Sequence, residues 1–394
     1  MRRLLYVLVA ASALATVLWV LTTSPTDPGT YAVEKRDLVS MDACTGGGKK
    51  SQEQVDCVVD IAMGIGTRQG VELKRWQQAL DTMEEFVIAH EFQYGHDLTH
   101  DFFLASKLDY SLIQRLNFDR RDIGFVHGWQ EWFLGQKENY GKVQEVYEKV
   151  CRSEQNLELA EDCSHGLGHV AYRQDIGTFA DRIRFCDSLS GFAHDPEAEV
   201  GQCYAGLLMS HGPPGKDPTL TSNERPSGPL PRPTRDEAAH LCKNATPKAA
   251  ERCWPWVVWF YYDEPGLLEK YFGVCDASGA GRWCGEGIAR YLFFYLYSTS
   301  DDLYVDTMNT CLDFPGGDQT KLGCAIEVVR IDIEDWIRSG NRTYREFDCS
   351  VIREHNGICA QAVETVFSTP CEVDQDVEWM DVCIRNRKAK HVGV

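Results

Sequence analysis

The sequence predicts an all-α protein built from tandem helical hairpins, an α/α solenoid or toroid clamped by sequential disulfides. Three observations support this fold. The sixteen cysteines fall into eight neighbouring pairs, and apolar residues recur at three- and four-residue steps after the second cysteine of most pairs. Sustained period-two alternation, the signature of half-buried strands, is missing from the sequence. Each hairpin would bury its apolar face against the next one along the chain.

The N-terminal segment 1–24 opens with two arginines and an uncharged, mostly apolar run from Leu4 to about Leu21. A helix of that length spans roughly 27 Å, close to the thickness of a bilayer core. We expect an uncleaved signal anchor, which the length of the run favours, or a signal peptide cleaved near Ala15. A linker over 25–40 would follow, and the body of the chain would be exported.

The cysteine content also indicates an oxidising compartment, because cytosolic thiols are kept reduced. No Cys-x-x-Cys motif occurs, which argues against thioredoxin-like redox chemistry and zinc ribbons. N-glycosylation sequons begin at Asn244 and Asn341 and agree with a secretory route. We expect a single-pass membrane glycoprotein with a lumenal or extracellular body, or a secreted protein if the N-terminal segment is cleaved.

The cysteine spacing predicts local disulfides. Partners are 9 to 17 residues apart, so each bridge would join the end of one helix to the start of the next. The predicted pairs are Cys44/Cys57, Cys151/Cys163, Cys186/Cys203, Cys242/Cys253, Cys275/Cys284, Cys311/Cys324, Cys349/Cys359 and Cys371/Cys383. The unit "CDASGAGRWCGEGIARYLFFY" (275–295) resembles the disulfide-clamped hairpins of secreted Sel1-type repeats, which implies an architecture of that kind.

The body of the chain divides around a loop with seven prolines, which cannot be helical. Because the repeat resumes beyond it, the loop separates two halves of one array. Two cysteine-free segments, 93–103 and 124–133, have the pattern of further helix starts. The predicted parts are N-terminal helical repeats with a histidine cluster (41–211), the Pro/Gly-rich loop (212–236), C-terminal disulfide-paired repeats (237–384) and a basic tail (385–394).

Histidines recur at corresponding places in three successive units. Positions two and six after the second cysteine share one helix face, and stacked units would bring these positions together. Imidazoles with a carboxylate suit zinc, iron or copper. The predicted metal ligands are His96, His100, His127, Glu131, His165 and His169, and Glu131 is alternatively the catalytic base. A purely structural cluster stays open, because histidines at helix starts also bind backbone carbonyls.

The later units carry other residues at these positions, among them Glu286, Arg290 and Arg330. They indicate a mixed, charged surface in the C-terminal half, not a second histidine site. If this surface lines the same cavity, Arg290 and Arg330 would bind a polar or anionic substrate.

Two function classes therefore remain open. One is an exported, membrane-anchored helical-repeat protein with a transition-metal site; if it is an enzyme, the metal would activate water or oxygen. The alternative is a non-catalytic, disulfide-stapled scaffold that binds a protein or peptide in its concave face. A glycosyltransferase would share the membrane topology but needs an α/β core, for which the sequence shows no strand–helix alternation. The net charge of −19 disfavours nucleic-acid binding.

Overall fold

The computed structural model contains seventeen α-helices in its described residues and no strand, which confirms the all-α fold. The described residues are 34–45, 51–90, 95–116, 124–151, 157–173, 177–211, 233–261, 267–296, 302–313, 315–338, 347–352 and 356–368. The predicted membrane segment, Asn341, the Cys371/Cys383 pair and the basic tail lie outside them. Within the described ranges, no helix is both long and apolar enough to cross a bilayer.

The chain forms two compact units, of which the smaller comprises residues up to 93 together with 108–119. Its helices are α2 (Lys35–Asp42), α3 (Ser51–Gly66), α4 (Glu72–His90) and the short α6 (Tyr110–Ile113). The first three pack on one another. A bidentate ion pair, with Arg68 Nη1 and Nη2 at 2.7 and 2.6 Å from the Asp37 carboxylate, ties α2 to the end of α3. α2 thus begins inside the segment expected to be a linker.

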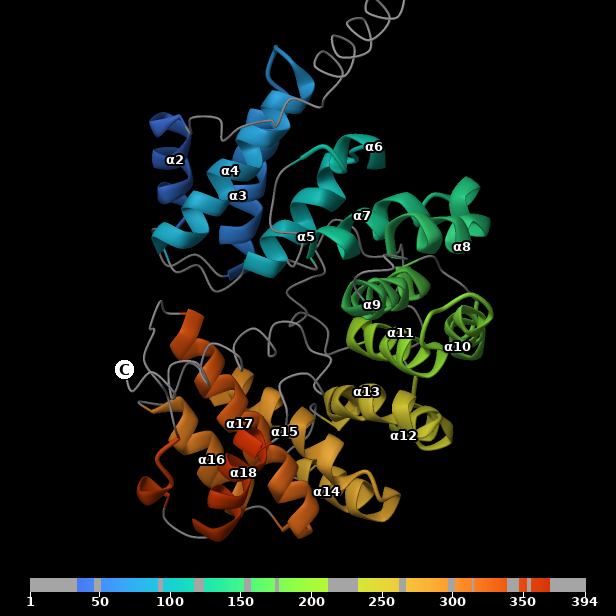
Figure 1. Ribbon diagram of the computed structural model, residues 1–394, viewed down its shortest axis with the longest axis vertical. Helices are drawn as coiled ribbons and strands as arrows, with labels where there is room; N and C mark the ends of the chain where they lie inside the picture. The colour runs from blue at the N-terminus through green and yellow to red at the C-terminus, as the bar shows by residue number, and fades with distance from the viewer. Residues whose placement is uncertain are drawn as a thin grey trace, which may run out of the picture. The chain divides into compact units, whose positions relative to one another are not determined.

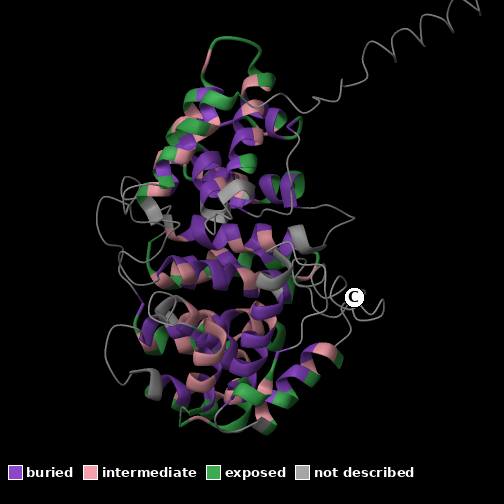
Figure 2. Cartoon of the chain, turned by 90° about the vertical axis from the view of Figure 1, so that its left-hand side faces the viewer, coloured by how far each residue is buried: buried purple, intermediate pink, exposed green. Residues whose placement is uncertain are grey.

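The larger unit contains a row of helices in which each packs on the next, as Figure 1 shows for α9, α11 and α13. The helices of this row, which we call the row helices, are α5 (Gly95–Ser106), α7 (Gly124–Leu134), α9 (Leu157–Arg173), α11 (Pro196–Ser210), α13 (Pro247–Val257), α15 (Gly281–Leu296), α17 (Asp318–Arg338) and α18 (Asn356–Ser368). Many of the buried residues belong to these helices. Figure 2 shows the buried residues in purple.

A further helix connects each pair of consecutive row helices from α7 to α17, so this part of the chain alternates between the two kinds of helix. These connecting helices are α8 (Val143–Val146), α10 (Phe179–Asp187), α12 (Arg235–Asn244), α14 (Leu267–Ser278) and α16 (Leu303–Asp313). Local sequence sets their starts. Thr178 with Asp181, and Thr234 with Glu237, form capping boxes that satisfy the first backbone N–H groups of α10 and α12. α12 therefore begins at Arg235, just inside the loop expected over 212–236.

Seven of the predicted disulfides are present, and the eighth pair lies outside the described residues. Their Cα–Cα distances of 5.5 to 5.9 Å are normal for a bridge. The second cysteine lies inside its row helix, not at the first residue as expected. Cys163, for example, belongs to the second turn of α9. Each of the six bridges in the larger unit therefore holds its row helix one or two turns beyond the helix start, and Cys57 is placed in the same way in α3 of the smaller unit.

Row helices approach each other closely enough for backbone contact. A Cβ atom added to Gly206 of α11 would lie 2.0 Å from the carbonyl oxygen of His165 in α9. A Cβ on Gly285 of α15 would lie 2.2 Å from the carbonyl oxygen of Thr320 in α17. Only glycine fits at such separations, so neighbouring units are held at a fixed distance.

Candidate functional site

The predicted metal ligands meet in two clusters, not in one site. The first combines His100 of α5 with Asp101 and Glu131, and the second combines His127, His165 and His169 from α7 and α9. The backbone of His96 belongs to α5, but its side chain lies outside the described residues. Residues at positions two and six of successive units thus lie close together. His100 contacts two carboxylates, whereas His127, His165 and His169 contact one another.

His100 is a buried cation. Its Nδ1 lies 2.8 Å from Asp101 Oδ1 and its Nε2 lies 3.1 Å from Glu131 Oε1, with the ring only 1% exposed. Burial by itself lowers the pKa of this imidazole, but attraction to Glu131 and the hydrogen bonds to both carboxylates outweigh it and raise the pKa to about 10. Both ring nitrogens therefore carry protons at neutral pH, and this ring is unsuited to bind a metal there.

Three imidazoles form the second cluster. The ring centres of His127 and His165 lie 5.3 Å apart, those of His127 and His169 5.4 Å, and those of His165 and His169 5.0 Å. His127 Nε2 donates to the Asp162 carbonyl oxygen at 3.0 Å. Ser210 Oγ donates to the Gly206 carbonyl oxygen, so His169 Nδ1 is the donor in its 2.6 Å bond to that hydroxyl. Two of the three rings thus have fixed orientations.

His165 connects this cluster to the next helices of the row. Its ring centre lies 5.8 Å from that of Trp256 in α13, and the Arg290 guanidinium of α15 lies 6.0 Å from the Trp256 ring centre. Burial lowers the pKa of His165 to about 4; a hydrogen bond with Gln202 opposes this shift, and the charge of Arg290 adds to it. The ring is therefore neutral at physiological pH.

The predicted substrate residues Arg290 and Arg330 belong to a partly buried charge cluster on α15 and α17. Arg290 Nε donates to Glu327 Oε1 at 2.7 Å, and Arg330 Nη1 lies 3.7 Å from Glu327 Oε2. Attraction to Glu327 raises the pKa of Arg290, although partial desolvation opposes this shift. These contacts place both arginines beside a carboxylate of the protein itself.

We call the connected residues His127, His165, His169, Trp256, Arg290 and Glu327 the polar seam. Sequence reasoning missed Trp256 and Glu327, which lie three residues after Cys253 and Cys324. Gly206, which contacts the neighbouring backbone, occupies the same place after Cys203. This third position faces the adjacent unit. Comparing the residues at this position in every repeat would have identified both Trp256 and Glu327.

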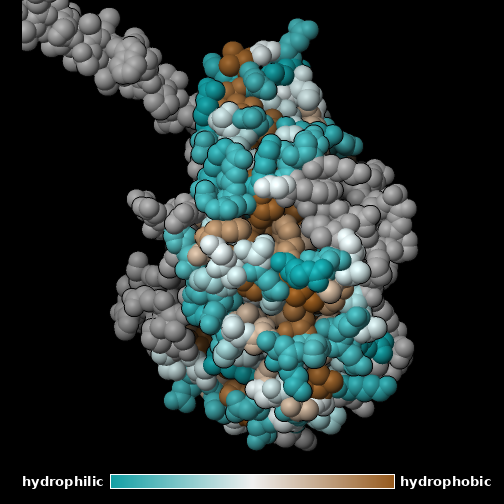
Figure 3. Space-filling model, turned by 90° about the vertical axis from the view of Figure 1, so that its right-hand side faces the viewer, coloured by the Kyte–Doolittle hydropathy of each residue, from teal (hydrophilic) through white to brown (hydrophobic). Residues whose placement is uncertain are grey.

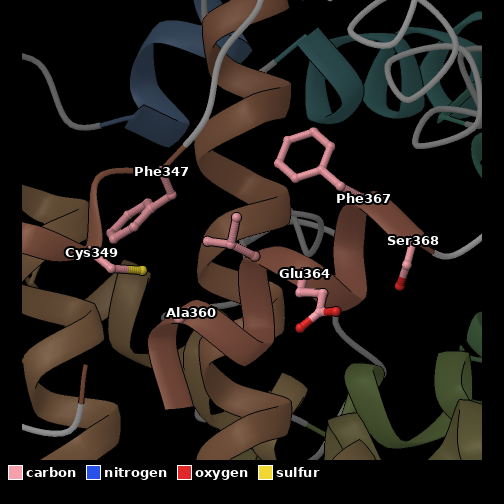
Figure 4. A pocket seen from close by; sticks show the side chains of 7 residues that line it. Phe347, Cys349, Ala360, Glu364, Phe367 and Ser368 are labelled. Carbon is pink, nitrogen blue, oxygen red and sulfur yellow. The ribbon is translucent and has the colours of Figure 1, made fainter. Parts of the chain in front are cut away.

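The described residues contain no group of three or more His, Cys, Asp or Glu side chains whose arrangement could hold a metal ion. A separate open cavity of about 500 Å³ lies beside α18 (Figure 4). It is lined by Phe347, Cys349, Ala360, Val363, Glu364, Phe367 and Ser368. None of the predicted site residues lines it.

No family model, curated protein or solved structure matches the chain. The resemblance to Sel1-type repeats therefore remains one of helical hairpin and disulfide arrangement. What the chain does has to be argued from its own geometry.

Proposed function

We propose that the chain is an exported, non-catalytic helical-repeat scaffold that binds a protein or peptide partner across successive row helices. The observation that carries this proposal is the fixed spacing of the row: backbone contact at glycine sets the distance between units, and each row helix from α9 onward is held by a disulfide to the segment before it. Arrays of this kind present side chains from several units on one continuous surface, and they bind partners without a catalytic centre.

The partly exposed members of the polar seam are the proposed contact residues. His165, Trp256 and Arg290 are each partly exposed and come from three different row helices. Tryptophan and arginine dominate the binding energy of many protein interfaces. Figure 3 shows apolar patches among hydrophilic residues on the right-hand face of the view in Figure 1.

Site-specific photo-crosslinking tests this proposal in the organism that makes the protein. A photoreactive amino acid replaces Trp256 in one variant and Lys243, an exposed residue of α12, in the control. We expect one discrete adduct from position 256 and none from position 243. The same partner should co-purify with the wild type and be lost with Arg290→Ala. Identical adducts from both positions, or none from either, would contradict a binding surface at the seam.

Export is supported by the seven local disulfides, because such bridges persist in oxidising compartments. Thiol labelling of the chain from its native host, denatured with and without reductant, tests this. We expect no maleimide adduct before reduction and sixteen after it. Asn244 is exposed at the end of α12, so its sequon is accessible, and in a glycosylating host a mass loss with an endoglycosidase is the second readout. Free thiols before reduction would contradict export.

Transition-metal binding is a second candidate function, favoured by the spacing of His127, His165 and His169. Three imidazoles on one tetrahedral zinc ion have ring centres about 5 Å apart, because each Zn–N bond measures about 2.0–2.1 Å. The three observed separations are 5.0 to 5.4 Å. Binding would require a rearrangement of the side chains, because their present arrangement could not hold a metal ion. Hydrogen bonds such as those to Asp162 and Ser210, if kept, would be outer hydrogen bonds typical of metal-bound histidines.

Metal analysis of the full chain, after dialysis against zinc, iron(II) or copper(II), tests this candidate. We expect one equivalent of metal in the wild type and none in His165→Ala. His240→Ala changes an exposed histidine of α12 and should retain the metal. A wild type without metal, or equal metal in all three proteins, would eliminate the candidate.

Glu131 has a different place in this proposal from the catalytic one expected. Its carboxylate oxygen Oε1 lies 3.1 Å from His100 Nε2 in a buried ion pair. Its contacts support a role in stabilising the junction of α5 and α7.

A further inference from the structure

The junction between α15 and α17 combines a close backbone contact with two buried carboxylates and partly exposed arginines. A Cβ on Gly285 would meet the Thr320 carbonyl oxygen at 2.2 Å, and one on Gly323 would meet the Arg282 carbonyl oxygen at 2.0 Å. The two helices therefore cannot move apart without losing this contact. Any change of charge between them acts on a tightly packed interface.

Two glutamates belong to this interface, Glu286 of α15 and Glu327 of α17, with 6% and 4% of their surface exposed. Glu327 Oε1 accepts from Arg290, whereas its buried Oε2 accepts no hydrogen bond and lies 3.7 Å from Arg330 Nη1. Glu286 has a weaker partner, because its Oε1 lies 3.9 Å from Nε of the more exposed Arg282. When both carboxylates are ionised, the charge of Glu327 acts against that of Glu286, and the charges of Arg330, Arg290 and Arg282 oppose this effect.

Four charged groups act on Glu286: Arg282 and Arg290 from its own helix, and Glu327 and Arg330 from α17. The other neighbouring elements contribute less to its charge environment. Pro255 of α13 contacts Gly287 of α15. The charged residues on the remaining packed helices are Lys248, Glu251 and Arg252 on α13, Lys270 and Asp276 on α14, and Asp306 and Asp313 on α16.

We propose that Glu286 is a proton-operated switch: its protonation removes the repulsion from Glu327 and tightens the junction of α15 and α17, and its ionisation loosens that junction. Burial, followed by the charge of Glu327, raises the pKa of Glu286 to about 7, although Arg330, Arg290 and Arg282 oppose the shift. The switch would thus operate across the pH range that an exported protein meets between neutral and mildly acidic compartments. It is independent of whether the seam binds a partner or a metal.

The direction of the pH dependence follows from linkage. The folded chain holds a proton at Glu286 up to about pH 7, whereas the unfolded chain releases it near 4.5. The stabilising contribution of this proton is fully present below 4.5 and is lost as the pH rises through 7. Each pH unit in that window changes the unfolding equilibrium constant by up to about tenfold.

The test compares urea unfolding of the wild type and Glu286→Gln from pH 5 to pH 8, using the full chain with its disulfides intact. Glutamine mimics the protonated carboxyl. We expect the ratio of the two unfolding constants, wild type over variant, to rise by about tenfold per pH unit between 5 and 7 and then level off. Glu364→Gln, an exposed change on α18, is the control. The ratio of unfolding constants, wild type over this variant, should not rise tenfold per pH unit between pH 5 and pH 7.

Hydrogen exchange supplies a second readout that needs no variant to fold. In the wild type, protection of α15 and α17 amides, measured against α3 and α4 in the same molecule, should decrease between pH 5 and pH 8. A relative protection independent of pH would overturn the proposal. So would an unchanging ratio of unfolding constants between the wild type and Glu286→Gln.

Discussion

The α9/α11 and α15/α17 junctions are built on the same backbone contact and carry different chemistry beside it. In the first, Gly206 lies against the His165 carbonyl, and in the second, Gly285 lies against the Thr320 carbonyl. Imidazoles and a serine hydroxyl flank the first contact, whereas carboxylates and guanidiniums flank the second. The comparison teaches that the repeat fixes helix spacing, while the residues beside the contact determine how each junction responds to pH and salt.

The largest effect on the free energy of unfolding is expected from the loss of the His100 charge in α5. His100→Gln leaves Asp101 and Glu131 buried without the cation between them, so we expect a loss of about 3–4 kcal/mol in unfolding free energy at pH 7. Since its pKa is about 10, the contribution of His100 is fully present below pH 6.5 and is lost as the pH rises through 10. Urea unfolding from pH 7 to pH 10 should show the difference from wild type shrinking. A constant difference would mean that the ring is not charged.

Alanine at the two glycines tests whether the junctions are equivalent. Gly206→Ala and Gly285→Ala each place a methyl group against a backbone carbonyl, so both should lose about 2–3 kcal/mol. Gly273→Ala in α14 is the matched control, because nothing lies within 4 Å of the added atom, and it should gain about 0.5–1 kcal/mol. Thermal unfolding measures all three. A mild effect at only one junction would show that its helices are less closely held.

Removal of the Glu327 charge should show that the α15/α17 junction depends on ion pairs. Glu327→Gln takes the shared anion from Arg290 and Arg330, and we expect a loss of about 2 kcal/mol, less than for a fully buried pair because Arg290 is about one-third exposed. High salt should reduce this loss in urea unfolding experiments. A loss that salt leaves unchanged would point to packing, not charge, as its cause.

The smallest effect concerns the neutral hydrogen bond of the first half. Ser210→Ala removes the partner of His169 Nδ1, and a loss of about 1 kcal/mol is expected, insensitive to salt. Chemical denaturation at low and high salt provides the comparison with Glu327→Gln. Equal salt dependence of Ser210→Ala and Glu327→Gln would contradict the proposed difference between the α9/α11 and α15/α17 junctions.

The cysteine spacing predicted the seven described disulfides, and together with the helical period and the missing strand alternation it predicted the fold class. The helical period after each second cysteine located the row helices. Helix starts were less predictable. Cys163 lies in the second turn of α9 because the helix already begins at Leu157, six residues earlier. Disulfide spacing carries no information about that start.

The candidate site was predictable in its register and not in its chemistry. Positions two and six do meet across units, as His127 and His165 show. The sequence could not reveal that His100 is engaged by its immediate neighbour Asp101, because the direction of adjacent side chains depends on the packing around them. Nor did it reveal that the seam passes through Trp256, which required knowledge of the distance between α9 and α13.

The locality of the bridges has a consequence for how the protein is made. Each described disulfide joins two consecutive cysteines, which are at most 17 residues apart. A hairpin can therefore be oxidised as soon as it enters an oxidising compartment, before later thiols compete for it. Mispairing, which grows steeply with the number of cysteines, is limited by the order of synthesis. Maturation of this chain should thus depend little on the reshuffling of incorrect crosslinks.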